Sequence, residues 1–352
     1  MLSDHRRALH RIPELDWVLP ETAAYLRAQL SALPCKVFSP CGDAVCAFFD
    51  FGKTETVAFR SDMDALPVTE RTELPFASAH AGKMHACGHD GHMAVLLGLA
   101  SYLAGQTDCK RNVLLIFQPA EETTGGAGAI CATGLLPQYH VACIYGIHLW
   151  PGLAKHTVAS CAGPMMARAA QLRVEVRGRS VHLAHWREGN DALAAAADFL
   201  RRVYAVAEQA PCILRFGRME SGTAPNTVSE STVLEGSLRC YDDGLFAHLT
   251  QSLFEAAAAV ETATACRFTV TKSDGYRAVS NDAALLAQAK KRFPIADAAP
   301  TYITEDFSEY QRHVPGVFFR LGTGDGAALH SPRFDFDEAV LETGLSLLKT
   351  LL

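Results

Sequence analysis

Short apolar runs of strand length alternate with helical patterns over much of this sequence, and polar side chains follow where the runs end. Val113–Phe117 leads into Glu121 and Glu122, and Cys143–Ile147 leads into His148. Alternating strands and helices favour an α/β sheet, and such sheets place their sites beyond the carboxyl ends of the strands. The pattern therefore predicts an α/β fold whose functional side chains gather at one edge of the sheet.

The middle of the chain departs from this alternation. Strand-like and helical segments follow in the order β-α-β-β-α-β, at residues 171–177, 190–207, 212–219, 232–240, 245–260 and 266–272. This is the order of a ferredoxin-like α+β unit. We therefore expect residues 1–163 and 276–352 to form one domain, with residues 164–275 inserted into it as a second.

Bulk composition excludes several classes of protein. The formal net charge is −6 and no basic run exceeds a triplet, so there is no electrostatic basis for binding nucleic acid or an anionic membrane surface. No apolar stretch reaches the ~18 residues of a membrane span, and the charged N-terminus does not resemble a signal peptide. The 11 cysteines are scattered without a CxxC pair, which predicts reduced thiols. We expect a cytoplasmic protein.

The densest group of metal-binding residue types is the segment His-Ala-Cys-Gly-His-Asp-Gly-His at residues 85–92. Cys87 and His89 are two residues apart, so both can face the same side of extended or loop backbone. Thiolate and imidazole are ligand types for zinc-like metals. The alternative is a histidine-rich turn before a helix, with His92 in the first helical turn, and these residues alone leave both interpretations open.

The adjacent carboxylates of Glu121 and Glu122 form a second candidate group. Neighbouring carboxylates repel each other unless a cation or separate functions justify their placement. In a two-metal hydrolase, one glutamate can bind metal while the other takes a proton from water. The alternative is a solvated surface pair, which is the more common case.

Single residues near other strand ends complete the candidates. His148 and His330 are isolated histidines, and such residues are more often structural than metal ligands. Asp62 and Asp64 follow the predicted strand Thr56–Arg60, where a carboxylate could orient a ligating histidine.

Taken in order along the chain, these segments resemble the amidohydrolase branch of the dinuclear aminoacylase/carboxypeptidase metallopeptidase family. That branch includes hippurate hydrolases, N-acyl-amino-acid deacetylases and auxin-conjugate hydrolases. The matching segments are RSDMDALP, MHACGHDGH, FQPAEETTGGA, YGIHLWP and ALHSP, with HRIPEL, TAPNTVSESTVLEGSLR, TEDFSEY and VPGVFFRLGTG as further matches. They cover nearly the whole chain. The resemblance implies a zinc-peptidase-like catalytic domain with an inserted ferredoxin-like lid and dimerisation domain.

The resemblance also implies functions for individual residues of the catalytic domain. The expected ligands of two divalent ions, zinc or manganese, are Cys87, His89, Glu122, His148 and His330. Glu121 matches the general base, and Asp64 matches the carboxylate behind the metal centre. The implied reaction is hydrolysis of the amide bond of a small N-acyl amino acid.

Further implied residues contact the substrate. His182 of the inserted domain matches a histidine that reaches into the active site of the partner subunit, which implies a homodimer or higher homo-oligomer. Asn226 and Arg239 match substrate-binding residues, and Arg239 suits a carboxylate because its guanidinium is a planar fork. The turn containing Gly322 and Gly324 matches a loop whose backbone N–H groups hold a carboxylate.

One segment departs from the family pattern. The lid loop reads Ser180-Val181-His182-Leu183-Ala184-His185-Trp186, where the family more often has glycines, small residues and proline around the histidine. We hypothesise that the bulkier side chains narrow or reshape the acyl pocket. His185 is then a rival to His182.

Three other functions compete with this interpretation. A metallo-dipeptidase would use the same mechanism but needs an acidic partner for the free amino group of its substrate. A cysteine hydrolase would use Cys87 with His85 or His89, leaving Glu122, His148 and His330 unexplained. A catalytically silent metal-binding protein would not require Glu121, which is present.

Overall fold

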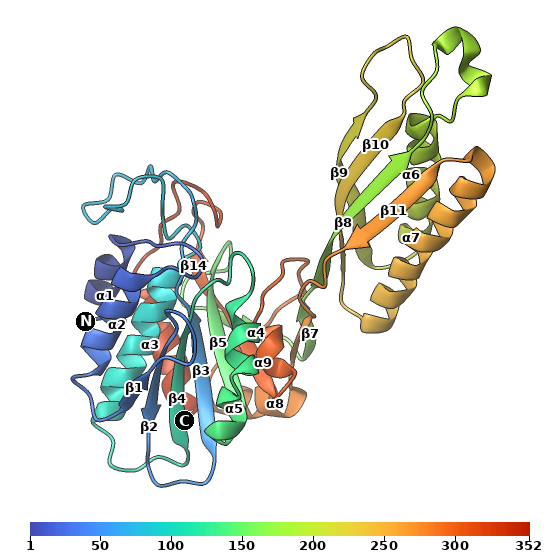
Figure 1. The fold of residues 1–352 in the computed structure, drawn as a ribbon. Coiled ribbons are helices and arrows are strands. Elements are labelled where there is room, and N and C mark those ends of the chain that lie inside the picture. The colour runs from blue at the N-terminus through green and yellow to red at the C-terminus, as the bar shows by residue number, and fades with distance from the viewer. The chain divides into compact units, whose positions relative to one another are not determined.

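The computed structural model describes residues 1–352 and divides them into two compact units, which are drawn in Figure 1. Unit 1 consists of Met1–Met165, Val279–Ala299 and Asp306–Leu352, and unit 2 of Met166–Ala278 and Pro300–Glu305. None of the helices combines the length and the apolar character needed to cross a lipid bilayer.

Unit 1 is built on an eight-stranded sheet. Its strands lie in the order β1 (Lys36–Phe38), β2 (Val45–Phe49), β4 (Asn112–Gln118), β3 (Thr56–Asp62), β5 (Val141–Pro151), β14 (Gly316–Gly324), β6 (Val158–Ser160) and β13 (Ile295–Asp297). The four central strands β4, β3, β5 and β14 pair in parallel. Their carboxyl ends therefore lie at the same edge of the sheet. A separate two-stranded sheet pairs β7 (Gly163–Met166) with β12 (Val279–Asn281).

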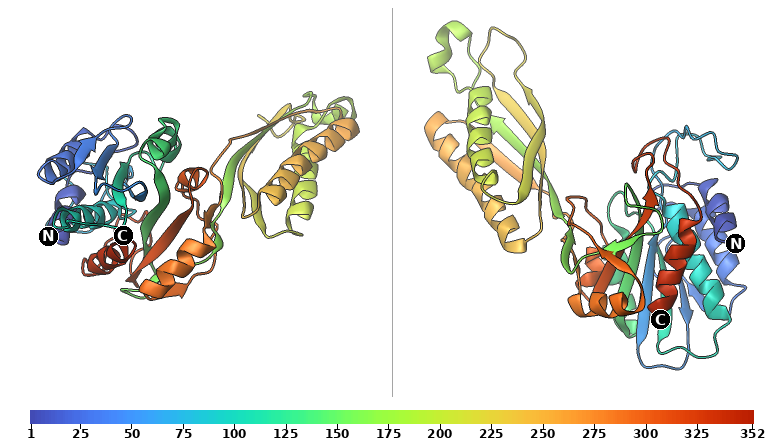
Figure 2. Two further views of the ribbon diagram at one scale, coloured as in Figure 1. Left: turned by 90° about the horizontal axis from the view of Figure 1, so that it is seen from below. Right: turned by 180° about the vertical axis from the view of Figure 1, so that it is seen from behind.

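Helices cover both faces of this sheet, as the two views of Figure 2 show. One face carries α1 (Leu2–His10), α2 (Pro20–Leu30), α3 (His89–Ala104), α8 (Ala283–Arg292) and α10 (Val340–Thr350), which share one large apolar core. The other carries α4 (Gly126–Ala132) and α5 (Leu135–Gln138), with α9 (Ser308–Gln311) against α4. Strand β4 is buried along its whole length. Because parallel strands covered on both faces need apolar side chains at every position, the apolar run of this strand is continuous.

Unit 2 is a four-stranded antiparallel sheet with helices packed on it. Its elements follow in the order β8 (Arg168–Arg177), the 3-10 helix η1 (Leu183–Glu188), α6 (Ala192–Ala207), β9 (Cys212–Ser221), β10 (Ser231–Cys240), α7 (Asp243–Thr264) and β11 (Arg267–Lys272). The strands lie side by side as β11-β8-β10-β9. Apolar residues of α6 and α7 form a core of their own with this sheet.

Hydrogen bonds attach the segment Pro300–Glu305 to the rest of unit 2. The Ile303 carbonyl accepts from the backbone N–H of Ala167 at 2.9 Å. The Tyr302 carbonyl accepts from Nη1 of Arg239 at 2.7 Å. The chain thus returns to unit 2 after it has left it at Ala278. The sequence pattern does not predict this return, because residues 300–305 form no helix or strand of their own.

Candidate metal centre

The side chains with metal-binding chemistry gather beyond the carboxyl ends of the central strands of unit 1. The five predicted ligands come from the loop before α3, the first residue of α3, the segment after β4, strand β5 and the loop after β14: Cys87, His89, Glu122, His148 and His330. Their positions follow from the parallel sheet, whose strand ends deliver residues far apart in sequence to one edge.

Distances join these five side chains into one cluster. Donor atoms of Cys87, Glu122 and His330 all lie within 4.8 Å of one another. The Cys87 Sγ lies 3.5 Å from Nε2 of His148. Nε2 of His89 lies 3.7 Å from Oε1 of Glu122. The structure therefore brings all five predicted ligands together. Cys87 lies close to Glu122 and His330 on one side and to His148 on the other.

Two of the histidines are oriented by hydrogen bonds from their outer nitrogen. Nδ1 of His89 lies 2.8 Å from the backbone carbonyl of Asp64, and Nδ1 of His148 lies 2.7 Å from the carbonyl of Leu149. Since a carbonyl only accepts, both Nδ1 atoms must carry the hydrogen. Nε2 of each ring is thereby left as the atom that faces the cluster, the arrangement found in metal-binding histidines.

His92 lies beside the cluster but is not available as a ligand. Its Nδ1 donates to Oδ1 of Asp62 at 2.7 Å, and its Nε2 accepts from the backbone N–H of Leu149 at 2.9 Å. Both ring nitrogens are therefore occupied. His92 links the end of β3 to the backbone next to His148, and Asp62 is held in turn by Nη1 of Arg60 at 3.0 Å.

The Asp64 carboxylate holds the backbone of the two glutamates. Its oxygens Oδ1 and Oδ2 accept from the N–H groups of Glu121 and Glu122, each at 3.1 Å. The preceding Ala120 has φ of 59°, in the left-handed region that non-glycine residues rarely adopt. The carboxylate of Glu121 lies within 4.8 Å of donor atoms of His89 and Glu122. Asp64 thus fixes the backbone positions of both glutamates.

His330 reaches the cluster from a strained loop. Its φ is 66°, and its backbone N–H donates to the carbonyl of Ala86 at 2.8 Å. This bond ties the loop after β14 to the segment that carries Cys87. Nε2 of His330 lies 3.4 Å from Oε1 of Glu122, and its side chain is 54% exposed, so this is the open side of the cluster.

The charge and unfilled hydrogen-bond capacity of the cluster fit a cation. Nε2 of His89 and Oε1 of Glu122 are buried and make no hydrogen bond. Burial opposes protonation of His89, yet the carboxylates of Asp62 and Glu122 raise its pKa to about 10. Positive charge is therefore strongly favoured at this position. Thiolate, imidazole and carboxylate donors around it are the ligand types of divalent transition metals.

The environment of Cys87 does not suit a nucleophilic cysteine. Burial, and then the carboxylates of Glu122 and Glu121, raise the pKa of its thiol well above the usual value. A nucleophilic cysteine needs the opposite, because the thiolate is the reactive form. A bound cation would stabilise the thiolate that these carboxylates disfavour, so the site suits a ligand better than a nucleophile.

Two of the three predicted substrate residues of unit 2 are exposed, and the third, Arg239, is half-buried. His182 is exposed at the start of η1, where its Nδ1 accepts from the backbone N–H of Ala184 at 3.2 Å. Asn226 is exposed and its carbonyl accepts from the N–H of Leu183 at 3.0 Å. Arg239 lies on β10 and donates to the Tyr302 carbonyl. His182 and Asn226 are therefore neighbours within unit 2.

The turn at the end of β14 was expected to bind a substrate carboxylate through its backbone N–H groups. The N–H of Gly322 donates to the carbonyl of Thr157 at 2.8 Å, and the N–H of Gly324 donates to that of Leu153 at 2.8 Å. Both N–H groups are used within unit 1, and carboxylate binding by this turn stays a prediction. Gly322 is required for packing, since a Cβ there would lie 2.1 Å from the Ala154 carbonyl oxygen.

A buried ionic network behind the ligands was not predicted. Asp90, the residue after His89, accepts from Nε of Arg6 at 3.2 Å and from Nδ1 of His10 at 2.8 Å. Nε2 of His10 lies 3.2 Å from Oε1 of Glu70. The segment HRIPEL was noted in the sequence, but nothing local showed that its histidine faces the residue beside a ligand.

Comparisons of the sequence with known proteins identify a peptidase family and deacetylases as relatives. The sequence profile of Peptidase family M20/M25/M40 matches residues 58–352. An N-acetyl-L-cysteine deacetylase of Bacillus subtilis (strain 168) is 33% identical over 350 residues, covering 96% of this chain and 83% of that protein. An N-acetyldiaminopimelate deacetylase of Lacticaseibacillus paracasei is 34% identical, covering 97% and 94%.

A solved structure resembles the whole chain. The YXEP protein of Bacillus subtilis, described as a dinuclear metal binding peptidase from this family, superposes with a TM-score of 0.90. It is 28% identical in sequence, and the comparison covers 99% of this chain and 96% of that one. The mixed α/β fold described above is thus shared with it.

Proposed function

This chain belongs to Peptidase family M20/M25/M40, and from that premise we propose that it hydrolyses the amide bond of small N-acyl amino acids with two divalent metal ions. The observation that carries the proposal is the convergence of five donor side chains beside one further glutamate. Cys87, His89, Glu122, His148 and His330 would hold the ions. The thiolate favours zinc, while imidazole and carboxylate also suit manganese.

Metal ions bound there would supply two kinds of chemistry, lowering the pKa of water and polarising the amide carbonyl. Glu121 would act as the proton carrier, since we assign its neighbour Glu122 as the ligand and Asp64 holds the backbone of both. We assign it as the base that takes a proton from the attacking water. The same group then gives that proton to the amine as the C–N bond breaks.

Unit 2 is proposed to be a ferredoxin-like lid and dimerisation domain. Its element order and the sheet order β11-β8-β10-β9 support the fold assignment. His182 would stabilise the negative charge on the carbonyl oxygen in the active site of a partner subunit. Its exposure at the start of η1 supports this function, because an exposed imidazole is available to another chain. The protein would then be a homodimer, and we propose that it is cytoplasmic.

The substrate proposal rests on the named relatives. Both are deacetylases, of N-acetyl-L-cysteine and of N-acetyldiaminopimelate. We propose an N-acetyl, N-benzoyl or related N-acyl amino acid, with its carboxylate bound by Arg239 and Asn226. A metallo-dipeptidase is less well supported, because we identify no acidic side chain dedicated to a free substrate amino group.

The test combines metal analysis with a substrate panel. Metal content would be measured by mass spectrometry, and hydrolysis would be followed with N-acetyl and N-benzoyl amino acids and with free dipeptides, with and without chelator. We expect about two metal ions per chain and N-acyl cleavage that chelation abolishes. Preferred cleavage of free dipeptides would instead identify the dipeptidase. Activity unaffected by chelation and by metal addition would refute the metal mechanism.

A further inference from the structure

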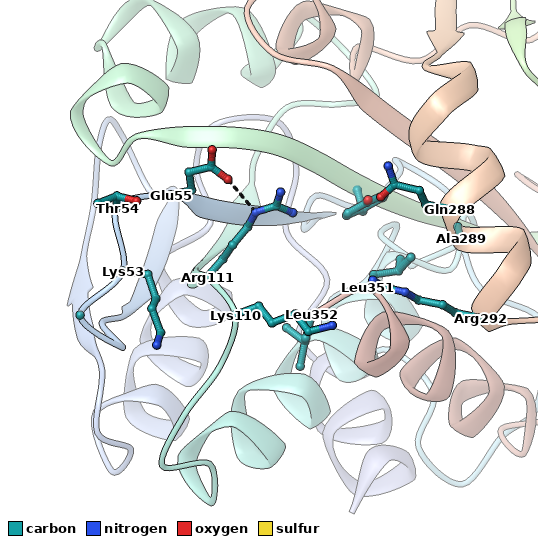
Figure 3. Close-up of a pocket in the computed structure, with 12 residues that line it drawn as sticks. Lys53, Thr54, Glu55, Lys110, Arg111, Gln288, Ala289, Arg292, Leu351 and Leu352 are labelled. Carbon is teal, nitrogen blue, oxygen red and sulfur yellow. Dashed lines mark hydrogen bonds and ion pairs between the residues drawn. The ribbon is translucent and has the colours of Figure 1, made fainter.

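We propose that unit 1 has a second binding site, for a small phosphate-bearing anion, at the edge of its sheet opposite the metal centre. A cavity of about 510 Å³ lies there. It is lined by the loop before β3, the loop before β4, the end of α8 and the residues after α10, as Figure 3 shows. Because β3 and β4 begin at this edge and lead to the metal centre at their other ends, the two sites are separate.

The cavity is strongly basic in an acidic protein. Its lining contains four cationic side chains, Lys53, Lys110, Arg111 and Arg292, and one acidic side chain, that of Glu55. The chain as a whole has a formal net charge of −6. A cleft lined mainly by one sign of charge focuses the potential and attracts ligands of the opposite sign.

Much of the donor capacity of these cations is unused. Arg111 pairs with Glu55 through Nε at 3.0 Å, which leaves its terminal nitrogens with only a 3.9 Å contact to Sγ of Cys143. Arg292 donates to one backbone carbonyl, that of Thr350, at 3.3 Å. Lys110 takes no part in any ion pair or side-chain hydrogen bond. Lys53 is paired with Asp108 at 2.8 Å, so we assign it a lesser contribution.

The shape of the cavity favours a compact ligand with oxygens in several directions. Its floor is formed by buried residues, including Tyr145 at 5% and Ala289 at 1% exposure. Figure 3 shows Arg111 and Arg292 entering from opposite sides. A planar carboxylate accepts from donors in one plane, whereas a phosphate offers oxygens to donors that converge from several segments. The volume is within the range of small-molecule sites.

A ligand in this cavity would add polar contacts between segments that are distant in sequence. An anion bound by Lys110, Arg111 and Arg292 would connect the loop before β4 with the end of α8, which already donates a hydrogen bond from Arg292 to the Thr350 carbonyl. We therefore expect binding to raise the unfolding temperature, because a ligand that binds only the folded state stabilises it.

The test is calorimetric titration of inorganic phosphate into the metal-loaded protein, with acetate as the carboxylate comparison. The double variant Lys110→Ala/Arg292→Ala removes two cations of the cavity that take part in no ion pair. The matched control Lys83→Ala/Lys291→Ala removes two cations of unit 1 that do not line it. We expect phosphate affinity to fall about 100-fold in the first variant, since each charge-assisted contact contributes about tenfold, and to stay nearly unchanged in the control.

Three results would overturn the proposal. Unchanged phosphate binding in Lys110→Ala/Arg292→Ala would place the anion elsewhere, for example at the metal centre. An equal loss in both double variants would reveal a general effect of net charge. Acetate binding more tightly than phosphate would exclude the proposed ligand class. Thermal unfolding of each variant without phosphate verifies that the fold is intact.

Discussion

The metal centre of unit 1 and the loop before α6 in unit 2 both carry histidines with proposed functions, but they are held very differently. His89 is 1% exposed and its ring is oriented by the Asp64 carbonyl. His182 is exposed, and its one side-chain hydrogen bond is accepted from the backbone N–H of Ala184, two residues further along the same loop. The chain itself therefore holds His89 more firmly than it holds His182.

The environments of these two regions also differ in polarity. The centre is backed by ion pairs such as Arg6 with Asp90, at 2% and 1% side-chain exposure. The loop exposes the apolar side chains of Leu183 and Trp186, at 46% and 57%. Substitutions of the assigned ligands, or of the buried network behind them, should therefore change metal binding or stability along with activity, while substitutions in the loop should change activity alone.

The largest effect is expected at Glu121. Replacing Glu121 with Gln preserves its shape but removes the proton acceptor, so we expect kcat to fall about 10²–10⁴-fold. Metal content, measured by mass spectrometry, should stay the same because Glu121 is not an assigned ligand. The matched control is Glu122→Gln, which should lose metal as well as activity. Near-normal turnover by Glu121→Gln would contradict the assignment.

Next in size is the effect of removing Arg6, which supports the centre from behind. This guanidinium lies near carboxylates of Asp90, Asp335 and Glu338. Arg6→Ala removes one of the two cationic partners of the buried Asp90 carboxylate and leaves only His10 beside it. The free energy of unfolding should therefore fall by up to about 3–5 kcal/mol. Denaturant unfolding measures this change.

The control for Arg6 is its neighbour on the same helix. Arg7 also pairs with Glu338, at 2.7 Å, but its side chain is 52% exposed. Arg7→Ala should cost about 0–1 kcal/mol because solvent screens exposed pairs. Equal losses for the two variants would show that burial does not decide the strength of this network.

A smaller loss is expected in the loop of unit 2. His182→Ala should lower kcat about 10²–10³-fold, the usual effect of removing a group that stabilises a developing oxyanion. The unfolding temperature should not change, since the side chain is exposed. His185→Ala is the matched control and should retain activity. Full turnover by His182→Ala with an inactive His185→Ala would reverse the assignment.

The smallest and most gradual effect is expected from pH. Burial opposes the charge of His10, but the carboxylates of Asp90 and Glu70 outweigh it and raise its pKa to about 9. Because the folded pKa exceeds the unfolded value of 6.5, this stabilisation is complete below 6.5 and is lost as pH rises through about 9.

At acidic pH, the stability contributed by Glu70 changes with pH in the opposite direction. Burial opposes ionisation of Glu70, yet hydrogen bonds from His10 and Thr72 lower its pKa to about 2. Its stabilisation is present above its usual value of 4.5 and is lost as pH falls through about 2. The unfolding temperature should therefore be highest between about pH 4.5 and 6.5, where both groups contribute their full stabilisation. His10→Gln should flatten the alkaline limb, and an unaltered profile would count against this network.

Local patterns were sufficient to predict the α/β alternation and the donor types of the candidate site. The apolar run of β4 and the helical pattern of α3 are properties of neighbouring residues. The order of strands was not predictable, because pairing depends on contacts between distant segments. The network of Arg6, His10 and Asp90 was missed for the same reason: α1 and α3 are about 80 residues apart in sequence, as the separation of 84 for Arg6 and Asp90 shows.

By itself, the sequence determined that apolar strand segments lead into Glu121–Glu122 and His148, and that a thiol and imidazoles lie at the start of a helix. Only the tertiary structure decided which nitrogens remain free. His92 has both of its nitrogens occupied while His89 keeps Nε2 toward the cluster. It likewise decided that the N–H groups at the end of β14 are used internally. Residue type sets which atoms a side chain offers, but the hydrogen-bond partners that use them arrive from remote segments of the chain.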